Sequence, residues 1–358
     1  MQIPISGHPL HTRSLTVVVS AEAGGRWRAR GDVVDLRKSG FVPMSQRLQP
    51  AGIIHLMTVR VDFEPASRRL ESISVAQPFV AIEPSSATGG ECCRDPAPRL
   101  QELVGECLDV GFPRRLGQVF GGALGCSHLL ILLQLMGSAL PRGLEREARL
   151  GAPTREPGER VFQCSSFVEG FEAGDGGLEY AVQLHDFHAR AGQVSQPLER
   201  LARHDEVRLF ARVEMPSLKL TRLDAAERTR DSATLASAAW SDPTERLTSL
   251  VGEPVVPGMA RRVFAALGGD EGAGLLRDAL LQLAPGHIQV MASIADRWFA
   301  MARSGAALRV GGGPAVATLG GFPDSCYMWR RDGILQSARQ SVLEKKQKRA
   351  KRRTTDSP

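Results

Sequence analysis

The chain has 358 residues, of which 42% are hydrophobic and 23% are charged, and its formal net charge is +6. A chain of this length and apolar content can bury two cores of ordinary size, and its six unevenly spaced cysteines exclude a small disulfide-stabilised scaffold. The positive charge is concentrated in residues 343–358, where seven Lys or Arg stand against two acidic residues. This tail alone carries +5, so the composition of the rest of the chain does not indicate a nucleic-acid-binding surface.

We interpret residues 339–358 as a basic, solvated tail that extends a helix beginning near Ile334. Contact of this tail with nucleic acid or an acidic partner is the alternative. Residues 1–20 lack a basic start followed by an apolar run, so we expect no secretory signal. The longest apolar stretch, residues 129–136, is too short to span a bilayer. We therefore expect a cytoplasmic protein with reduced thiols and no membrane partner.

The first part of the chain has the pattern of an antiparallel sheet followed by helices. Residues 53–63 alternate in polarity, which places His55 on the same face as Met57 and Val59. The other expected elements, in chain order, are a hairpin formed by residues 14–20 and 25–37, a strand over 70–75 that pairs with 53–63, a loop over 81–90, helices over 95–104, 114–120 and 126–136, and a Pro-, Gly- and Arg-rich linker over 141–159.

The second part of the chain has the same order of patterns. The expected elements are strands near 180–189, 206–215 and 219–223, helices between 244 and 304, and a glycine-rich strand pair over 308–321. Each part is thus a small antiparallel sheet followed by packed helices, which predicts an α+β fold.

The two parts also align with each other, which indicates an internal duplication. A shift of 147 residues superimposes one part on the other without a gap over the helical region. The matches include Asp95-Pro96 with Asp242-Pro243, Leu103-Val104-Gly105-Glu106 with Leu250-Val251-Gly252-Glu253, Arg114-Arg115 with Arg261-Arg262, and Gly121-Gly122 with Gly268-Gly269. We predict repeat 1 over residues 1–175, a diverged repeat 2 over 176–338, and the basic tail over 339–358.

Polar residues suited to a metal or catalytic site gather in repeat 1. Thiolates together with imidazoles suit zinc or iron, so the candidate metal ligands are His55, Cys93, Cys126 and His128. The start of a helix lowers the pKa of a thiol, which makes Cys126 a candidate nucleophile with His128 or His55 as its base. The catalytic candidates are His11, Arg13 and Cys126, with Arg13 or Arg114 holding a carboxylate. The alternative is that these side chains are ordinary core residues.

The aligned positions of repeat 2 are apolar. Cys93, Cys126, His128 and His55 fall on Trp240, Ala273, Leu275 and Val207, respectively. This pattern is expected of a copy without a site, so we place the candidate site in repeat 1 and interpret repeat 2 as a built-in partner subunit.

Several motifs together resemble a bacterial family catalogued as domain of unknown function 2889. They are His11-Thr12-Arg13, Ile54-His55-Leu56-Met57, Cys93, Leu103-Val104-Gly105, Gly125-Cys126-Ser127-His128-Leu129 and Cys326-Tyr327-Met328-Trp329-Arg330-Arg331-Asp332-Gly333. The chain departs from the family pattern at Leu56, where the family has an acidic residue after the strand histidine. The resemblance implies a bacterial protein associated with catabolism of aromatic or acyl compounds, and it brings no established chemistry.

The order of strands, a cysteine loop, Leu-Val-Gly and a Cys/His pair at a helix start is also similar to that of iron–sulfur scaffold proteins, which hold a cluster or zinc with three cysteines and a nearby acidic or histidine group. Two functions follow as hypotheses. The first is an enzyme acting on a small-molecule ligand at a zinc, iron or thiol centre in repeat 1, with His11 or His55 as acid/base. The second is a non-enzymatic metal or cluster carrier, or a ligand-binding accessory subunit. Either function is compatible with an oligomer.

Overall fold

A computed structural model describes residues 3–41, 48–151, 154–268, 274–295 and 321–341, together with two short strands at 309–310 and 313–314. The first half contains β1 (His8–Ala21), β2 (Trp27–Arg37), β3 (Gly52–Glu64), β4 (Arg69–Phe79), the 3₁₀ helix η3 (Ala97–Leu103), α1 (Phe112–Phe120) and α2 (Ser127–Leu150). The second half contains β5 (Arg160–Glu172), β6 (Leu178–Ala189), β7 (Leu201–Val213), β8 (Leu220–Arg230), the 3₁₀ helix η6 (Thr244–Leu250), α3 (Met259–Leu267), α4 (Gly274–Leu281) and α5 (Leu283–Ser293).

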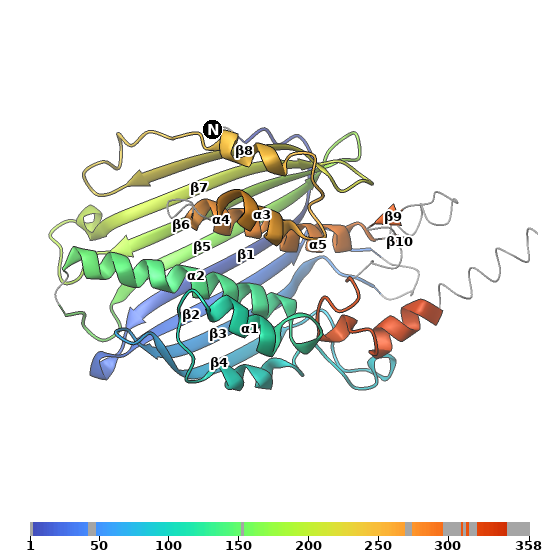
Figure 1. The fold of residues 1–358 in the computed structure, drawn as a ribbon, viewed down its shortest axis with the longest axis horizontal. Coiled ribbons are helices and arrows are strands. Elements are labelled where there is room, and N and C mark those ends of the chain that lie inside the picture. Colours follow the sequence, from blue (N-terminus) through green and yellow to red (C-terminus); the bar gives the residue numbers. More distant parts are fainter. Residues whose placement is uncertain are drawn as a thin grey trace, which may run out of the picture.

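The eight long strands form one continuous antiparallel sheet in the order β4-β3-β2-β1-β5-β6-β7-β8 (Figure 1). The predicted α+β class is confirmed, but the expectation of two small sheets is wrong. The halves join where β1 pairs with β5, in a register that runs from His8 opposite Glu172 to Ser20 opposite Arg160. Joining them satisfies the backbone N–H and C=O groups that two separate sheets would each leave open at an additional edge.

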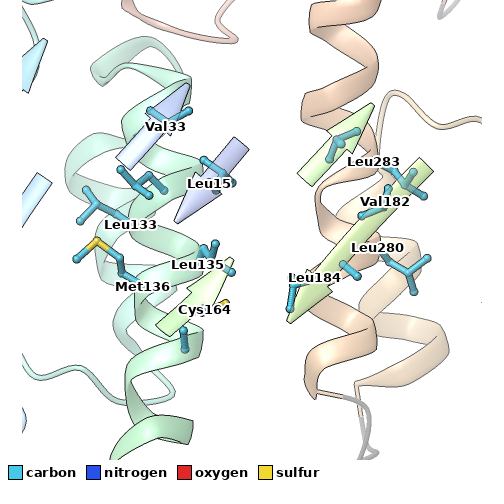
Figure 2. Packing of buried hydrophobic residues seen from close by; sticks show 14 of the residues in the cluster. Leu15, Val33, Leu133, Leu135, Met136, Cys164, Val182, Leu184, Leu280 and Leu283 are labelled. Carbon is cyan, nitrogen blue, oxygen red and sulfur yellow. The ribbon is translucent and has the colours of Figure 1, made fainter. Parts of the chain in front are cut away.

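The helices cover one face of this sheet, as Figure 1 shows. On β1 and β2 every second side chain is buried beneath them, and α2 packs its own apolar side chains on these strands (Figure 2). Helix α4 packs on β6 and β7, and α5 packs on β1 and β5. The close approach of α2 depends on Gly31 of β2, because a Cβ there would lie 2.9 Å from the Met136 sulfur and 3.0 Å from a Leu132 methyl carbon. The buried apolar residues form one cluster that spans both halves.

Residues 141–150 are helical, so the prediction of a linker over 141–159 is wrong for this part. They continue α2 through Pro141 to Leu150. The arginines that suggest a linker in the sequence are instead ion-pair partners of the sheet. Arg142 lies 3.0 Å from Asp186 of β6, and Arg146 lies 3.1 Å from the same carboxylate. The ion pairs of these two half-buried arginines with a buried carboxylate of β6 explain why residues 141–150 pack on the sheet as a helix.

The two halves share local geometry as well as element order. Both η3 and α1 recur 147 residues later as η6 and α3, with the same lengths. In the first half, the amide of Gly105 donates a hydrogen bond of 2.8 Å to the carbonyl of Leu70. In the second half, Gly252 donates one of 2.7 Å to Leu220. Both glycines have φ near +90°, a conformation that disfavours other residues.

The remaining expectations for the C-terminal region are met only in part. The glycine-rich segment contains the paired strands β9 (Arg309–Val310) and β10 (Gly313–Pro314), while its other residues lie outside the described ranges. A helix spans residues 334–341, as expected, and the basic tail beyond it also lies outside the described ranges. In the part of the chain that the structure describes, no helix is long and apolar enough to cross a membrane.

A polar pair is enclosed in the core of the second half, and it makes stability depend on pH. Tyr180 of β6 and His287 of α5 are both buried, and the Tyr180 hydroxyl lies 2.7 Å from Nδ1 of His287. Burial lowers the pKa of His287 from 6.5 to about 3. The unfolded chain therefore binds a proton between these pH values that the folded chain does not, so folding stability is lost as pH falls from 6.5 towards 3.

We expect His287→Gln to flatten this pH dependence, since the amide oxygen still accepts from Tyr180 but does not titrate. A shift of one pKa unit corresponds to about 1.4 kcal/mol, so the difference between variant and wild type should reach a few kcal/mol at the acid end. Urea unfolding between pH 7 and about pH 4 measures it. His8→Gln, at an exposed histidine of β1, is the control, and equal slopes for His287→Gln and wild type would contradict the assignment.

Candidate metal centre

The candidate site is built around Asp35, which lies in the middle of a row of side chains across three strands. In the sheet register Arg13 of β1 is opposite Asp35 of β2, and Asp35 is opposite His55 of β3. All three side chains point to the helix-covered face and are buried, and Asp35 has no exposed surface. A carboxylate in such a position requires charged or hydrogen-bonding partners.

Four side chains supply those partners. His55 Nδ1 lies 3.1 Å from Oδ2 of Asp35, and Arg13 lies 3.1 Å from Oδ1 through Nε and 3.3 Å from Oδ2 through a terminal nitrogen. His128 Nε2 is 3.4 Å from Oδ2, and His11 Nε2 is 3.7 Å from Oδ1. One fully buried carboxylate is therefore surrounded by three imidazoles and one guanidinium.

The start of α2 brings His128 to this row. Cys126 precedes the helix, and its sulfur lies 3.8 Å from His128 Nδ1. On the other side of the ring, the side-chain nitrogen of Gln289 lies 3.1 Å from His128 Nε2. Gln289 belongs to α5, so the second half of the chain contributes a side chain to the site. The rings of His55 and His128 stack with their centroids 3.7 Å apart.

Electrostatics keep Asp35 charged and His11 and His128 neutral. Burial raises the pKa of Asp35, but Arg13 and the neighbouring histidines outweigh it and hold that pKa well below its usual range. Burial lowers the pKa of His11 to about 4, against the opposing effect of Asp35. The pKa of His128 is lowered, first by burial and then by His55 and Arg13. Neutral imidazoles beside a carboxylate are the protonation state in which these groups bind metal ions.

Three ligand atoms are close enough to share one cation. A carboxylate oxygen of Asp35 and one ring nitrogen each of His55 and His128 lie within 4.8 Å of one another, and all three residues are buried. In addition, Nε2 of His11 and Oδ1 of Asp35 are buried and lack an aligned hydrogen bond. Two histidines and one carboxylate are a donor set typical of Zn²⁺ or non-haem Fe²⁺.

Most of the predicted site residues lie in this cluster. His11, Arg13, His55, Cys126 and His128 all lie around Asp35. Arg13 is already paired with Asp35, and Arg114 is exposed on α1, so neither is placed as the carboxylate-binding residue that the sequence suggests.

The other cysteines lie elsewhere. Cys164 is on β5, where its thiol interacts electrostatically with Asp186 and Arg142. Cys93 is in the loop after β4, and its pKa is raised by burial and by the nearby thiols of Cys126 and Cys326. Cys326 is held close to α2 because the following amide, of Tyr327, donates a hydrogen bond of 2.8 Å to Gly125. The thiols of Cys93, Cys126 and Cys326 thus form a group beside the histidine cluster, and burial raises the pKa of Cys126 to about 11.

Sequence reasoning missed Asp35, the centre of the cluster. The signal was present, because Asp35 follows Val33 by two residues in a strand whose alternate side chains are apolar. A charged residue on the buried face of a strand indicates a buried polar site. His55 is followed by Leu56 and not by an acidic residue. Asp35 nevertheless provides a carboxylate partner for His55, from the adjacent strand.

The second half has a corresponding row with different chemistry, in which Asp205 and not Val207 occupies the position of His55, so that part of the expected alignment is wrong. Cys164 of β5 is opposite Asp186 of β6, which is opposite Asp205 of β7. Arg142 and Arg146 of α2 pair with these carboxylates in place of the imidazoles of the first half. In the described part of the chain, the Asp35 cluster is the single group of three close His, Cys, Asp or Glu ligand atoms.

Comparison with known proteins gives one family. Residues 11–141 match the model of a family described as protein of unknown function (DUF2889). The matched region begins at His11 and includes all of β2, β3 and β4 and the start of α2, so it contains Asp35 and the three histidines. No curated protein and no solved structure matches the chain.

Proposed function

We propose that the protein is an enzyme that uses a zinc or iron ion, held by Asp35, His55 and His128, to act on a small molecule. The observation that carries this proposal is the convergence of one carboxylate and two imidazoles in a buried cluster. A cation there would polarise an oxygen of the substrate or activate a bound water. His11, whose Nε2 is buried beside Asp35 without an aligned hydrogen bond, is placed to accept a proton.

Burial also supports an enzyme over a carrier. A carrier must expose its metal to a partner protein, whereas Cys126 and His128 are both buried beneath the helices. An enzyme benefits from an enclosed site, because exclusion of water strengthens the electrostatic interactions inside it. A cytoplasmic location and a role in aromatic or acyl catabolism remain part of this proposal.

A thiol-based enzyme is the second candidate, favoured by one contact. The Cys126 sulfur lies 3.8 Å from His128 Nδ1, and Asp35 lies on the opposite side of that ring, which is the order nucleophile, base and carboxylate. The raised pKa of Cys126 makes it a poor nucleophile, since the thiolate is the reactive form. We therefore prefer the metal-dependent reaction.

We also infer that the chain arose by duplication, with the site in the first copy. The identical spacing of η3 with η6 and of α1 with α3 supports this inference, as do the equivalent rows centred on Asp35 and Asp186. These rows relate β5 to β1, so the second copy would begin at β5, earlier than residue 176. Gln289 beside His128 gives the second copy a supporting role at the site.

Elemental analysis of protein purified without a metal-affinity tag tests the metal proposal. We expect about one zinc or iron ion per chain in the wild type and in Cys126→Ser, and loss of the metal in His55→Ala and His128→Ala. His185→Ala, in β6 at a histidine outside the cluster, is the matched control and should keep the metal. Absence of metal from wild-type protein, even after equilibration with Zn²⁺ or Fe²⁺, would reject the proposal. Loss of metal from Cys126→Ser would instead place the thiol among the ligands.

A further inference from the structure

Arg37 is a buried cation without a charged partner in the described part of the chain. It ends β2, two residues after Asp35, so both side chains point to the same face of the strand. Only 8% of Arg37 is exposed. Its neighbours are the Gln49 side-chain oxygen, 3.2 Å from a terminal nitrogen, and the Phe41 ring, whose centroid lies 5.4 Å from the guanidinium carbon. Its Nε is buried and has no hydrogen-bond partner among the residues that the structure describes.

This arrangement differs from that of two other arginines on the helix-covered face of the sheet. Arg13 pairs with Asp35, and on the second half Arg142 pairs with Asp186 and Asp278. Burying a guanidinium without an anion is unfavourable, because the lost hydration is not replaced. A buried arginine without a charged partner, beside a candidate reaction centre, is therefore most simply explained by a ligand whose anionic group pairs with the guanidinium.

Arg37 lies next to the candidate metal centre in the sheet. In the sheet register Arg37 is directly opposite His11, whose imidazole lies 3.7 Å from Asp35. A molecule held by Arg37 would thus place its neighbouring atoms next to His11 and Asp35.

We propose that Arg37 binds the carboxylate of the substrate, so that the substrate class is a small carboxylic acid. One guanidinium presents two parallel N–H donors that match a carboxylate. Phe41 provides an apolar surface beside it, and Gln49 provides a neutral polar group. A doubly charged phosphate would call for more cations or amide donors than this group supplies. The assignment of a substrate rests on the proposed function, whereas binding of a carboxylate to Arg37 does not require the metal.

Titration of the full chain with acetate, benzoate and succinate, each with and without Zn²⁺, tests this proposal. We expect at least one of these acids to bind wild-type protein and to bind Arg37→Met at least about tenfold more weakly, since hydrogen bonds to charged groups are the stronger class. Benzamide and inorganic phosphate, as neutral and dianionic comparisons, should show no such difference. Arg30→Met is the matched control, because Arg30 lies on the same strand, is exposed and pairs with Asp32.

The melting temperature of the ligand-free protein gives a second readout. Arg37→Met should leave it unchanged or raise it, because an uncompensated buried charge is removed, whereas a purely structural arginine would lower it. If no carboxylate distinguishes wild type from Arg37→Met, the proposal is rejected whatever the melting temperature. If a carboxylate distinguishes them but the wild type binds neither Zn²⁺ nor Fe²⁺, carboxylate binding by Arg37 stands and the metal-dependent function fails.

Discussion

Arg13→Met is expected to destabilise the metal-free protein by about 3–5 kcal/mol, the usual cost of breaking a buried ion pair by removing one partner. Methionine fills a similar volume, so the loss comes from Asp35, which remains fully buried without its guanidinium partner. The nearby imidazoles of His11, His55 and His128 cannot replace that charge unless they are protonated. Urea unfolding of chelator-treated protein measures the change.

Zinc should reverse much of this loss. A cation at Asp35, His55 and His128 would neutralise the unpaired charge of the buried carboxylate, and the variant lacks the guanidinium that repels a cation. Binding to the folded state alone stabilises by about 4 kcal/mol when free zinc exceeds its Kd a thousandfold. The gain should therefore be larger in Arg13→Met than in wild type. Equal gains, or none, would mean that Asp35 is not a ligand.

Arg30→Met serves as the control for this experiment. Arg30 pairs with Asp32 on β2 but is exposed, and exposed ion pairs contribute at most about 1 kcal/mol. The loss of unfolding free energy caused by Arg30→Met should be small, and zinc should not change it. A large effect of Arg30→Met would show that replacement of any arginine near β2 disturbs the sheet.

Local patterns in the sequence were enough to predict many of the elements. The alternation over 53–63 corresponds to β3, and the helix expected at 126–136 starts within one residue of α2. The strand β5 was missed because Ser165, Ser166 and Gly170 interrupt its apolar pattern. The end of α2 was missed because its arginines resemble those of a linker. Their partners, Asp186 and Asp278, are far away in sequence, so only the tertiary structure identifies them.

The site was predictable in its residue types but not in its geometry. Histidines at 11, 55 and 128 could be selected from the sequence because imidazoles are common ligands, but their common partner Asp35 became evident only through strand register. The register depends on which strands pair, and the sequence did not predict that β1 joins both halves. Arg37 shows the same limit, since its significance lies in the absence of a charged partner among the described residues.

Arg142→Met tests whether α2 joins the two halves through charge, and it separates this network from the metal site. Arg142 lies 3.0 Å from Asp186 and 2.5 Å from Asp278 of α4, and it also donates to the Ser138 hydroxyl at 2.7 Å. Both carboxylates are buried. Removing the guanidinium leaves Asp278 without a charged partner among the residues that the structure describes, while Asp186 keeps Arg146. We expect a loss of about 3–5 kcal/mol in the free energy of unfolding.

Zinc should not restore the stability of Arg142→Met beyond the gain that it gives the wild type. In the described part of the chain the freed carboxylates of Asp186 and Asp278 have no third ligand close enough to complete a metal site. The double variant Arg142→Met/Asp278→Leu should recover part of the loss, because it removes the unpaired charge together with its partner. Arg13→Met and Arg142→Met thus break similar buried ion pairs at corresponding rows of the sheet, and only the first is expected to respond to zinc. A zinc response in both variants would point to non-specific binding by unpaired carboxylates and would remove the support that Arg13→Met gives to the centre at Asp35.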